Sequence, residues 1–133
     1  MSKIIRRHVG QLIVAGFTGT TIPSELRALA REFDLGGVIL FERNVEAAEQ
    51  VAELAYEAKN LSLKLPAWVS VDQEGGRVIR LHEPFTEWPS MQALGRTGAE
   101  SLTKRFAEAL ALELRTVGVT LDYVPVLDVQ TNP

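Results

Sequence analysis

The chain has 133 residues, of which 46% are hydrophobic and 23% charged, and its formal net charge is −3. This balance is typical of one compact globular domain and argues against a disordered chain. Basic residues cluster only at Arg6 and Arg7, which argues against a nucleic-acid partner, and no apolar stretch approaches the roughly 20 residues of a membrane span. The sequence contains no cysteine, which excludes disulfides and thiolate metal sites.

The N-terminal segment MSKIIRRHVGQLIVAGF joins a basic patch to a short apolar run. A signal peptide has a similar composition, but the run over 12–17 is shorter than the usual apolar region of about 7–15 residues. No small-residue cleavage site follows it cleanly. We therefore predict a first strand over 11–17 and a cytoplasmic protein.

Three helices are predicted along the rest of the chain. Pro23 suits the first turn of a helix over 23–33, in which apolar residues recur three and four positions apart. Asn44 is the predicted N-cap of a second helix, whose apolar stripe continues to Ala58. A third helix with one apolar face is predicted over 98–116.

Four predicted strands alternate with these helices, and each is a nearly continuous apolar run. Trp68 lies within the third of them and is predicted to belong to the core. The strands cover 11–17, 38–41, 67–71 and 119–129. Alternation of this kind predicts an α/β fold with a parallel sheet, covered on both faces and connected by right-handed crossovers.

Two architectures fit this order of elements: an open doubly wound sheet, or part of a (β/α)8 TIM-type barrel. The chain stops just past the fourth predicted strand, without a helix to cover it, which favours the barrel. A whole barrel needs about 250 residues. We therefore expect residues 1–133 to be the N-terminal half of a (β/α)8 barrel, truncated after the fourth of its parallel strands.

Polar residues follow each predicted strand, at the edge where parallel α/β proteins place their functional groups. Acids and arginines recur there, which suits a polar ligand rich in hydroxyl groups. The segments are Thr18-Gly19-Thr20, Glu42-Arg43-Asn44, the stretch from Asp72 to Arg77, and Asp128.

The stretch VSVDQEGGRVIRL, over 69–81, is the densest of these segments. Asp72 and Glu74 point the same way on an extended backbone, and two carboxylates about 5–5.5 Å apart are the acid and nucleophile of a retaining glycosidase. In the alternative interpretation, Glu74 braces the turn at Gly75 and Gly76 through backbone N–H groups. The glycine pair allows a sharp turn close to a ligand or a neighbouring strand, but its spacing is not that of a nucleotide-binding loop.

Two arginines follow in the same stretch. Arg77 or Arg80 could donate two hydrogen bonds to a carboxylate or to sugar oxygens. The structural alternative is a salt bridge to Glu74 or Glu83, which we expect for Arg77 rather than for Arg80.

Three further residues have both a functional and a structural interpretation. His82 could be a general base, although a lone loop histidine is usually solvated. Trp88 could stack on a sugar face, or it could only fix its loop. Asp128 lies at the polar edge that follows the strands, and its structural alternative is to hold the next loop by side-chain to backbone hydrogen bonds. No spacing of acidic residues and histidines supports a metal site, so we expect neither a metal nor a cofactor.

Four segments in this order resemble glycoside hydrolase family 3: GGVILFERN, VSVDQEGGRVIRL, FTEWPSMQALG and LDYVPVLDVQTNP. They are most similar to its bacterial β-N-acetylhexosaminidase branch, which removes N-acetylglucosamine during cell-wall peptidoglycan recycling. The resemblance runs from about residue 10 to the last residue. It implies a (β/α)8 catalytic domain and a retaining, metal-free hydrolysis of terminal β-linked N-acetylglucosamine.

The resemblance also implies roles for individual residues. Asp72 resembles the aspartate that binds hydroxyls of the terminal sugar, and Arg80 resembles a second substrate contact. By the same match Glu74 is not the nucleophile. The family's acid/base histidine and nucleophilic aspartate lie beyond the segments found here. We therefore expect the parent protein to be the enzyme and the 133-residue chain alone to be inactive.

Half a barrel leaves a sheet edge and an inner face uncovered, so we expect the chain to self-associate. Two alternatives to a glycosidase remain at this stage: a non-catalytic sugar-binding module, or a flavodoxin-like domain that works through partners. Strand order distinguishes the flavodoxin-like domain from a barrel half, because a doubly wound sheet reverses its strand order at a switch point and a barrel half does not.

Overall fold

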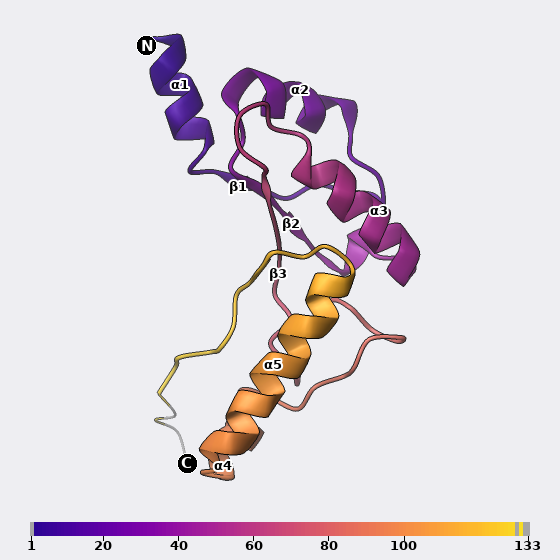
Figure 1. Cartoon of the computed structure of the whole chain (residues 1–133), viewed down its shortest axis with the longest axis vertical. Helices are drawn as coiled ribbons and strands as arrows, with labels where there is room; N and C mark the ends of the chain where they lie inside the picture. Colours follow the sequence, from indigo (N-terminus) through magenta and orange to yellow (C-terminus); the bar gives the residue numbers. More distant parts are fainter. Residues whose placement is uncertain (1, 130, 132–133) are drawn as a thin grey trace.

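The computed structural model describes residues 2–129 and 131 as a parallel α/β unit (Figure 1). Its helices are α1 (Lys3–Gly10), α2 (Ser24–Phe33), α3 (Ala48–Lys59), α4 (Met91–Arg96) and α5 (Glu100–Thr116), with a 3-10 turn, η1, at Glu42–Asn44. Its strands are β1 (Val14–Ala15), β2 (Gly37–Leu40), β3 (Trp68–Val71) and β4 (Leu121–Asp122). None of the described helices combines the length and the hydropathy needed to cross a bilayer.

The four strands form one parallel sheet in the order β1-β2-β3-β4. Neighbours in the sheet are therefore neighbours in the chain, without the reversal that defines a doubly wound sheet. This order confirms the predicted barrel half and excludes the flavodoxin-like alternative. Within the described residues the barrel is not closed, because β1 and β4 form its two edges.

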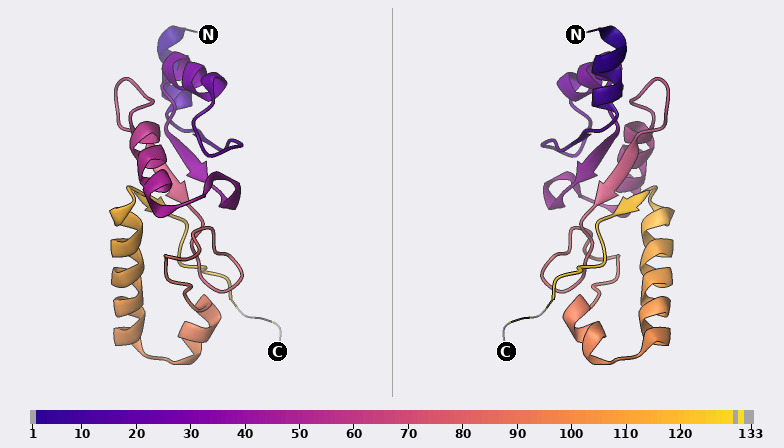
Figure 2. Two further views of the ribbon diagram at one scale, coloured as in Figure 1. Left: turned by 90° about the vertical axis from the view of Figure 1, so that its right-hand side faces the viewer. Right: turned by 90° about the vertical axis from the view of Figure 1, so that its left-hand side faces the viewer.

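The hydrophobic core lies on the helix-covered face of this sheet. α3 and α5 lie on the same side of the strands (Figure 2). Alternate strand residues point toward them and are fully buried, namely Val38, Leu40, Val69 and Val71. The predicted helical stripes supply the opposite side of the core, through residues such as Val51 on α3 and Leu110 on α5.

Trp68 does not belong to this core, so its predicted burial is wrong. Its side chain is 55% exposed, at the first position of β3. Because side chains alternate along a strand, Trp68 lies on the face opposite to Val69 and Val71.

The N-terminal segment also differs from the prediction. Residues 3–10 form α1, whose N-cap Ser2 accepts a hydrogen bond from the Ile5 N–H. The predicted strand over 11–17 is reduced to Val14–Ala15. The fourth strand is shortened in the same way, from the predicted 119–129 to Leu121–Asp122.

Asn44 has a different role from the predicted helix cap, because α3 begins four residues later, with Ala47 as its N-cap. The Asn44 side chain is fully buried. It accepts a hydrogen bond from the Phe41 N–H and donates to the Phe17 and Gly19 carbonyls. Asn44 therefore joins the loop after β1 to the loop after β2.

Candidate functional site

The carboxyl ends of the strands share one edge of the sheet, because all the strands are parallel. The loops after β1, β2 and β3 therefore meet there, as the sequence predicts for a functional edge. The loop after β3, over 72–81, contributes the candidate ligand-binding side chains.

Asp72 and Arg80 come together at this edge. Asp72 directly follows β3, and its Oδ2 lies 3.7 Å from Nη2 of Arg80. The side chains of Asp72 and Arg80 are 25% and 26% exposed, so each retains some contact with solvent. The pair presents hydrogen-bond acceptors and donors side by side, which is the pattern that a sugar ring with several hydroxyls can match.

Arg80 is oriented by its surroundings as well as by Asp72. Its guanidinium carbon lies 6.0 Å from the centre of the Phe41 ring, and that of Arg43 lies 4.4 Å from the same ring. Arg43 in turn donates from Nε to the Phe17 carbonyl. The loop after β2 therefore supplies an aromatic support for the arginine of the loop after β3.

Gln73 fixes the course of the loop that carries both residues. Its side chain is 1% exposed. The amide oxygen accepts hydrogen bonds from the backbone N–H groups of Arg80 (2.8 Å) and Leu81 (3.1 Å), and the amide nitrogen donates to the Leu81 carbonyl (2.9 Å). No role was predicted for Gln73 from the sequence.

The glycine pair serves close packing between two segments of the chain. Gly75 and Gly76 have φ angles of 83° and 63°, in the left-handed region that favours glycine. A Cβ on Gly75 would lie 2.3 Å from the Pro89 carbonyl oxygen, and one on Gly76 would lie 2.7 Å from Cβ of Ser90. Of the two uses that the sequence left open, the structure shows the approach to a neighbouring segment.

The turn itself is closed by backbone hydrogen bonds. The Glu74 N–H donates to the Val78 carbonyl, and the Val78 N–H donates to the Gly75 carbonyl. The turn is thus held by the backbone, whereas one interpretation of the sequence assigned that role to the Glu74 carboxylate.

Asp122, at the end of β4, is a half-buried residue that was not among the candidates predicted from the sequence. Its Oδ1 accepts a 2.9 Å hydrogen bond from the Gln73 N–H, and its Oδ2 is buried without a partner among the described residues. Burial raises the pKa of Asp122 to about 6, and the nearby charges of Asp72 and Glu74 act in the same direction. An acid inside the largely apolar segment over 119–127 was the signal available in the sequence.

The other predicted candidates lie outside this arrangement. His82 pairs with Glu87 (Nδ1–Oε1 3.0 Å) in an exposed position. Arg77 and Asp128 are exposed. The arginine of this loop that forms an ion pair among the described residues is Arg80, and its partner is Asp72, not the expected Glu74 or Glu83. Within the described ranges, no three acidic residues or histidines are grouped so that they could hold a metal ion.

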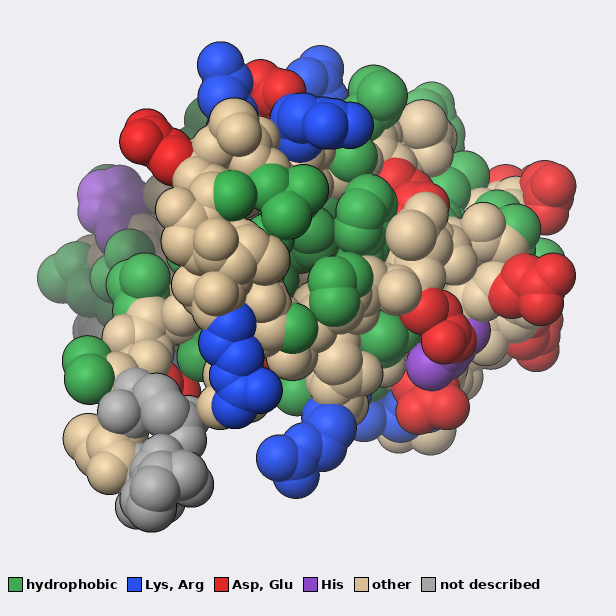
Figure 3. All heavy atoms as spheres, turned by 90° about the horizontal axis from the view of Figure 1, so that it is seen from below, with side chains coloured by type: hydrophobic (Ala, Val, Ile, Leu, Met, Phe, Trp, Pro, Cys, Tyr) green, Lys and Arg blue, Asp and Glu red, His purple; other side chains and the backbone are tan. Residues whose placement is uncertain are grey.

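Trp88 fixes its loop in this structure. Its indole N–H donates to Oε2 of Glu113, and its ring packs edge-on against Phe106, with 5.1 Å between the ring centres. Trp88 also lines an apolar groove together with Leu94 of α4 and Leu102 of α5. Seen from the end where α4 lies, hydrophobic side chains gather near the middle of the surface, bordered by basic ones (Figure 3).

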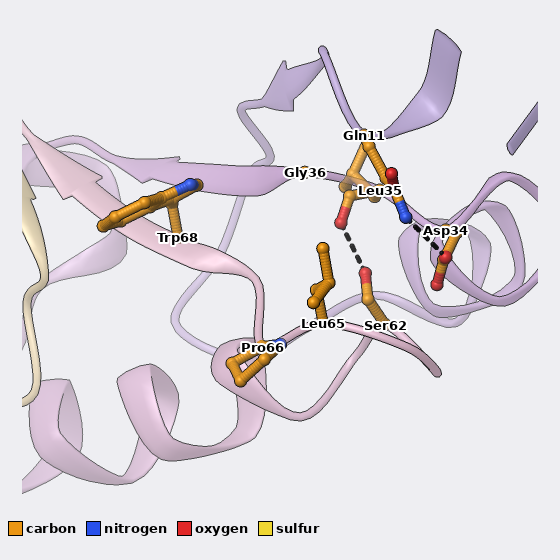
Figure 4. Close-up of a pocket in the computed structure, with 8 residues that line it drawn as sticks. All are labelled: Gln11, Asp34, Leu35, Gly36, Ser62, Leu65, Pro66 and Trp68. Atoms are coloured by element: carbon orange, nitrogen blue, oxygen red, sulfur yellow. Dashed lines mark hydrogen bonds between the residues drawn. The ribbon is translucent and has the colours of Figure 1, made fainter. Parts of the chain in front are cut away.

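A cavity of about 230 Å³ lies at the opposite end of the sheet, near the amino ends of β2 and β3 (Figure 4). Its polar groups are already paired within the protein. Gln11 donates to Asp34, and the Ser62 hydroxyl donates to the Leu35 carbonyl. We therefore assign this cavity to the packing of the loops rather than to ligand binding.

Sequentially ordered parallel strands, with an acid and an arginine at their carboxyl edge, define half of a TIM-type barrel with a polar mouth. The family described as "Glycosyl hydrolase family 3 N terminal domain" matches residues 4–133. The chain therefore belongs to glycosyl hydrolase family 3, as the resemblance implied.

Named relatives agree with this assignment. A Beta-hexosaminidase of Pseudomonas aeruginosa (strain LESB58) is 38% identical over 111 residues, which cover 83% of this chain and 33% of that protein. Beta-hexosaminidase A of Pseudoalteromonas piscicida is 34% identical over 122 residues, which cover 86% of this chain and 20% of that protein.

Solved structures show the same fold. A glycoside hydrolase family 3 beta-N-acetylglucosaminidase from Paenibacillus sp. str. FPU-7 matches with a TM-score of 0.89 and 36% identity, over 96% of this chain and 25% of that one. NagZ from Neisseria gonorrhoeae, in complex with N-trifluoroacetyl-D-glucosamine, matches with a TM-score of 0.80 and 33% identity, over 90% of this chain and 37% of that one. The chain thus spans between a fifth and two fifths of the length of these proteins.

Proposed function

We propose that this chain forms the sugar-binding part of a glycoside hydrolase that removes terminal β-linked N-acetylglucosamine by a retaining mechanism. The observation that carries the proposal is the pairing of Asp72 with Arg80 at the carboxyl edge of the sheet, with both side chains partly exposed. The names of the relatives support the reaction class, and the N-trifluoroacetyl-D-glucosamine bound to the Neisseria protein supports the sugar.

In this proposal the two side chains act as a complementary pair. The Asp72 carboxylate accepts hydrogen bonds from adjacent sugar hydroxyls, and the Arg80 guanidinium donates to a sugar oxygen. Asp72 binds substrate and does not attack the sugar.

We further propose that residues 1–133 are the first half of the catalytic barrel of a longer enzyme. Two findings support this: the matching family is an N-terminal domain, and the chain spans about a third of the Pseudomonas hexosaminidase. The nucleophile and the acid/base group then come from the part of the protein outside this chain. No metal or cofactor takes part.

The proposal is tested by titrating the ¹⁵N-labelled chain with N-acetylglucosamine, and with glucose for comparison. We expect amide shifts in the loop over 72–81, which Asp72→Asn abolishes and Glu74→Gln leaves unchanged. Hydrolysis of 4-nitrophenyl N-acetyl-β-D-glucosaminide by the same samples should stay at the buffer rate. Turnover that depends on Asp72 or Glu74 would overturn the division of roles and make these two the active carboxylates. Shifts that are the same in Asp72→Asn would overturn the assigned site.

A further inference from the structure

A buried polar network lies directly beneath the proposed sugar-binding pair. Gln73 is one residue from Asp72 in the chain, and its amide oxygen is bonded to the backbone N–H of Arg80. Its own backbone N–H donates to Oδ1 of Asp122, so the same residue is attached to β4. Gln73 is therefore the one residue of the loop that is linked to both members of the pair and to the neighbouring strand.

The hydrogen bonds of Gln73 are well suited to fix the span of the loop between residues 73 and 81. Three hydrogen bonds hold the Gln73 side chain in one orientation, at a site from which water is excluded. Buried hydrogen bonds of this kind are costly to break, so the loop between residues 73 and 81 has little freedom to change its span. The contact between Asp72 and Arg80, at 3.7 Å, is looser and does not set that span by itself.

We propose that Gln73 is a positioning residue that sets the separation and orientation of Asp72 and Arg80 for sugar binding. The inference rests on the proposed function, since it assigns the same two residues to the sugar. Gln73 itself touches no substrate, because its amide is engaged with the backbone of Arg80 and Leu81.

The test compares Gln73→Met and Gln73→Glu with the parent chain. Methionine keeps the length of the side chain but cannot replace the three hydrogen bonds. Gln50→Met is the matched control, because Gln50 also ties loops through three hydrogen bonds, to Glu46, Thr20 and Asn44, none of which lies in the loop over 72–81.

Amide hydrogen exchange and the ¹³C signal of the Asp72 carboxyl are the first readouts, since neither needs a bound sugar. In Gln73→Met we expect exchange at Arg80 and Leu81 to rise at least about tenfold, as expected when a buried hydrogen bond is lost. The Asp72 signal should shift, because Arg80 moves away from it. Exchange in β2 should stay the same, and Gln50→Met should show neither change at the loop.

Gln73→Glu adds a pH-dependent readout that a residue important only for folding would not show. A protonated glutamic acid can donate to the Leu81 carbonyl as the glutamine does, whereas an ionised one would face that carbonyl with a repelling oxygen. Measured relative to the parent chain at each pH, protection of Arg80 and Leu81 should therefore recover as the pH falls. Affinity for N-acetylglucosamine should recover with it, from a loss of about tenfold.

Three results would overturn the positioning role: unchanged exchange at Arg80 and Leu81 in Gln73→Met, an equal rise across β2 and β3, or no pH-dependent recovery in Gln73→Glu. Failure of the parent chain to bind N-acetylglucosamine is a separate outcome, and it would count against the proposed function alone. The exchange and ¹³C measurements would still decide the role of Gln73 in that case.

Discussion

The Asp122 carboxylate accepts a 2.9 Å hydrogen bond from the backbone N–H of Gln73, across 49 positions of sequence. The last residue of β4 is thereby joined to the first turn of the loop after β3. Because Asp122 is half-buried, with its Oδ2 enclosed, and lies near two other acids, its charge has a cost for the folded state.

The first prediction concerns the pH dependence of stability at Asp122. Its pKa in the folded state, about 6, exceeds its ordinary value of 3.8, so the folded state holds a proton that the unfolded chain has already released between these values. The contribution of Asp122 to stability therefore falls as the pH rises from about 4 to about 6, and is constant above that window. Asp122→Asn should raise the melting temperature at pH 7.5 and leave it nearly unchanged at pH 4.

Differential scanning fluorimetry across this range measures the effect. Asp128→Asn is the matched control, because it removes one carboxyl charge at an exposed position. A constant difference between Asp122→Asn and the parent chain at every pH would contradict the assignment.

A second prediction separates the two arginines of the loop. Arg80→Lys should weaken N-acetylglucosamine binding by roughly tenfold, because an ammonium group cannot reproduce the planar fork of donors beside Asp72 and the Phe41 ring. Arg77→Lys should bind like the parent chain, since Arg77 is exposed and outside the pair. Calorimetric titration gives both affinities. An unchanged affinity in Arg80→Lys would show that the planar fork is not needed, and equal losses in the two variants would contradict the assignment of the contact to Arg80.

The close packing of the glycine turn gives a third prediction. Gly75→Ala forces a left-handed φ on alanine, at roughly 1–2 kcal/mol, and adds a clash with the Pro89 carbonyl. The loss of stability should therefore exceed that figure in urea denaturation. Gly95→Ala, in α4 with open space around its Cα, should instead stabilise the chain by about 0.5–1 kcal/mol. Similar losses in both variants would contradict the packing argument.

A fourth prediction concerns Asp34, the C-cap of α2, which has a φ of 60°. Burial acts to raise the pKa of Asp34, but hydrogen bonds from Gln11, Leu63 and Lys64 outweigh it and lower the pKa. The ionised form therefore stabilises the fold above the ordinary pKa of an aspartate, and this stabilisation is lost as the pH falls through the lowered value.

Asp34→Ala should cost about 2–4 kcal/mol, from the left-handed φ and the lost hydrogen bonds together. Asp34→Gly removes the same hydrogen bonds without the penalty on φ. Its free energy of unfolding should therefore lie about 1 kcal/mol closer to that of the parent chain. Chemical denaturation of the three proteins at pH 7 gives the comparison. A glycine variant as unstable as the alanine variant would mean that φ contributes nothing.

The fifth prediction is self-association of the 133-residue chain. Large apolar side chains are exposed at both edges of the sheet, including Leu12 near β1 and Leu127 after β4, each 85% exposed. We expect sedimentation velocity to show a species larger than the monomer that dissociates on dilution, and Leu127→Lys to weaken it. Tyr56→Lys, on an exposed position of α3, should not. A monodisperse monomer with one cooperative melting transition at all concentrations would contradict this prediction.

Periodicity in the sequence was sufficient for the larger elements. The helices over 23–33 and 98–116 and all four strands lie within two or three residues of the predicted starts, or inside the predicted ranges. α1 was missed although Ile5 and Val9 stand four positions apart, as on one side of a helix, because eight residues give too short a period to be recognised. α4 is only six residues long, too short for a helical period to be recognised.

The site was only partly accessible to the same reasoning. Asp72 and Arg80 were selected because a distinctive stretch of residues carries them, and the structure brings the two side chains together. Gln73, Asp122 and Asn44 were not, because what each does depends on a partner brought near by folding, up to 49 positions away. Whether a polar side chain is solvated or buried against such a partner is set by packing, which local sequence does not report.

The sequential strand order has a consequence for how the protein is made. β2 pairs with β3, and β3 with β4, in the order in which the ribosome releases them. The sheet can therefore grow one strand at a time, without waiting for distant sequence. The loop that carries Asp72 and Arg80 is an exception, since its attachment through Gln73 N–H needs Asp122. On a translating ribosome the hydrogen bonds within residues 73–81 can form early, but the loop is attached to β4 only when the fourth strand emerges. The loop proposed to bind sugar would therefore be among the last parts of this chain to be fully anchored.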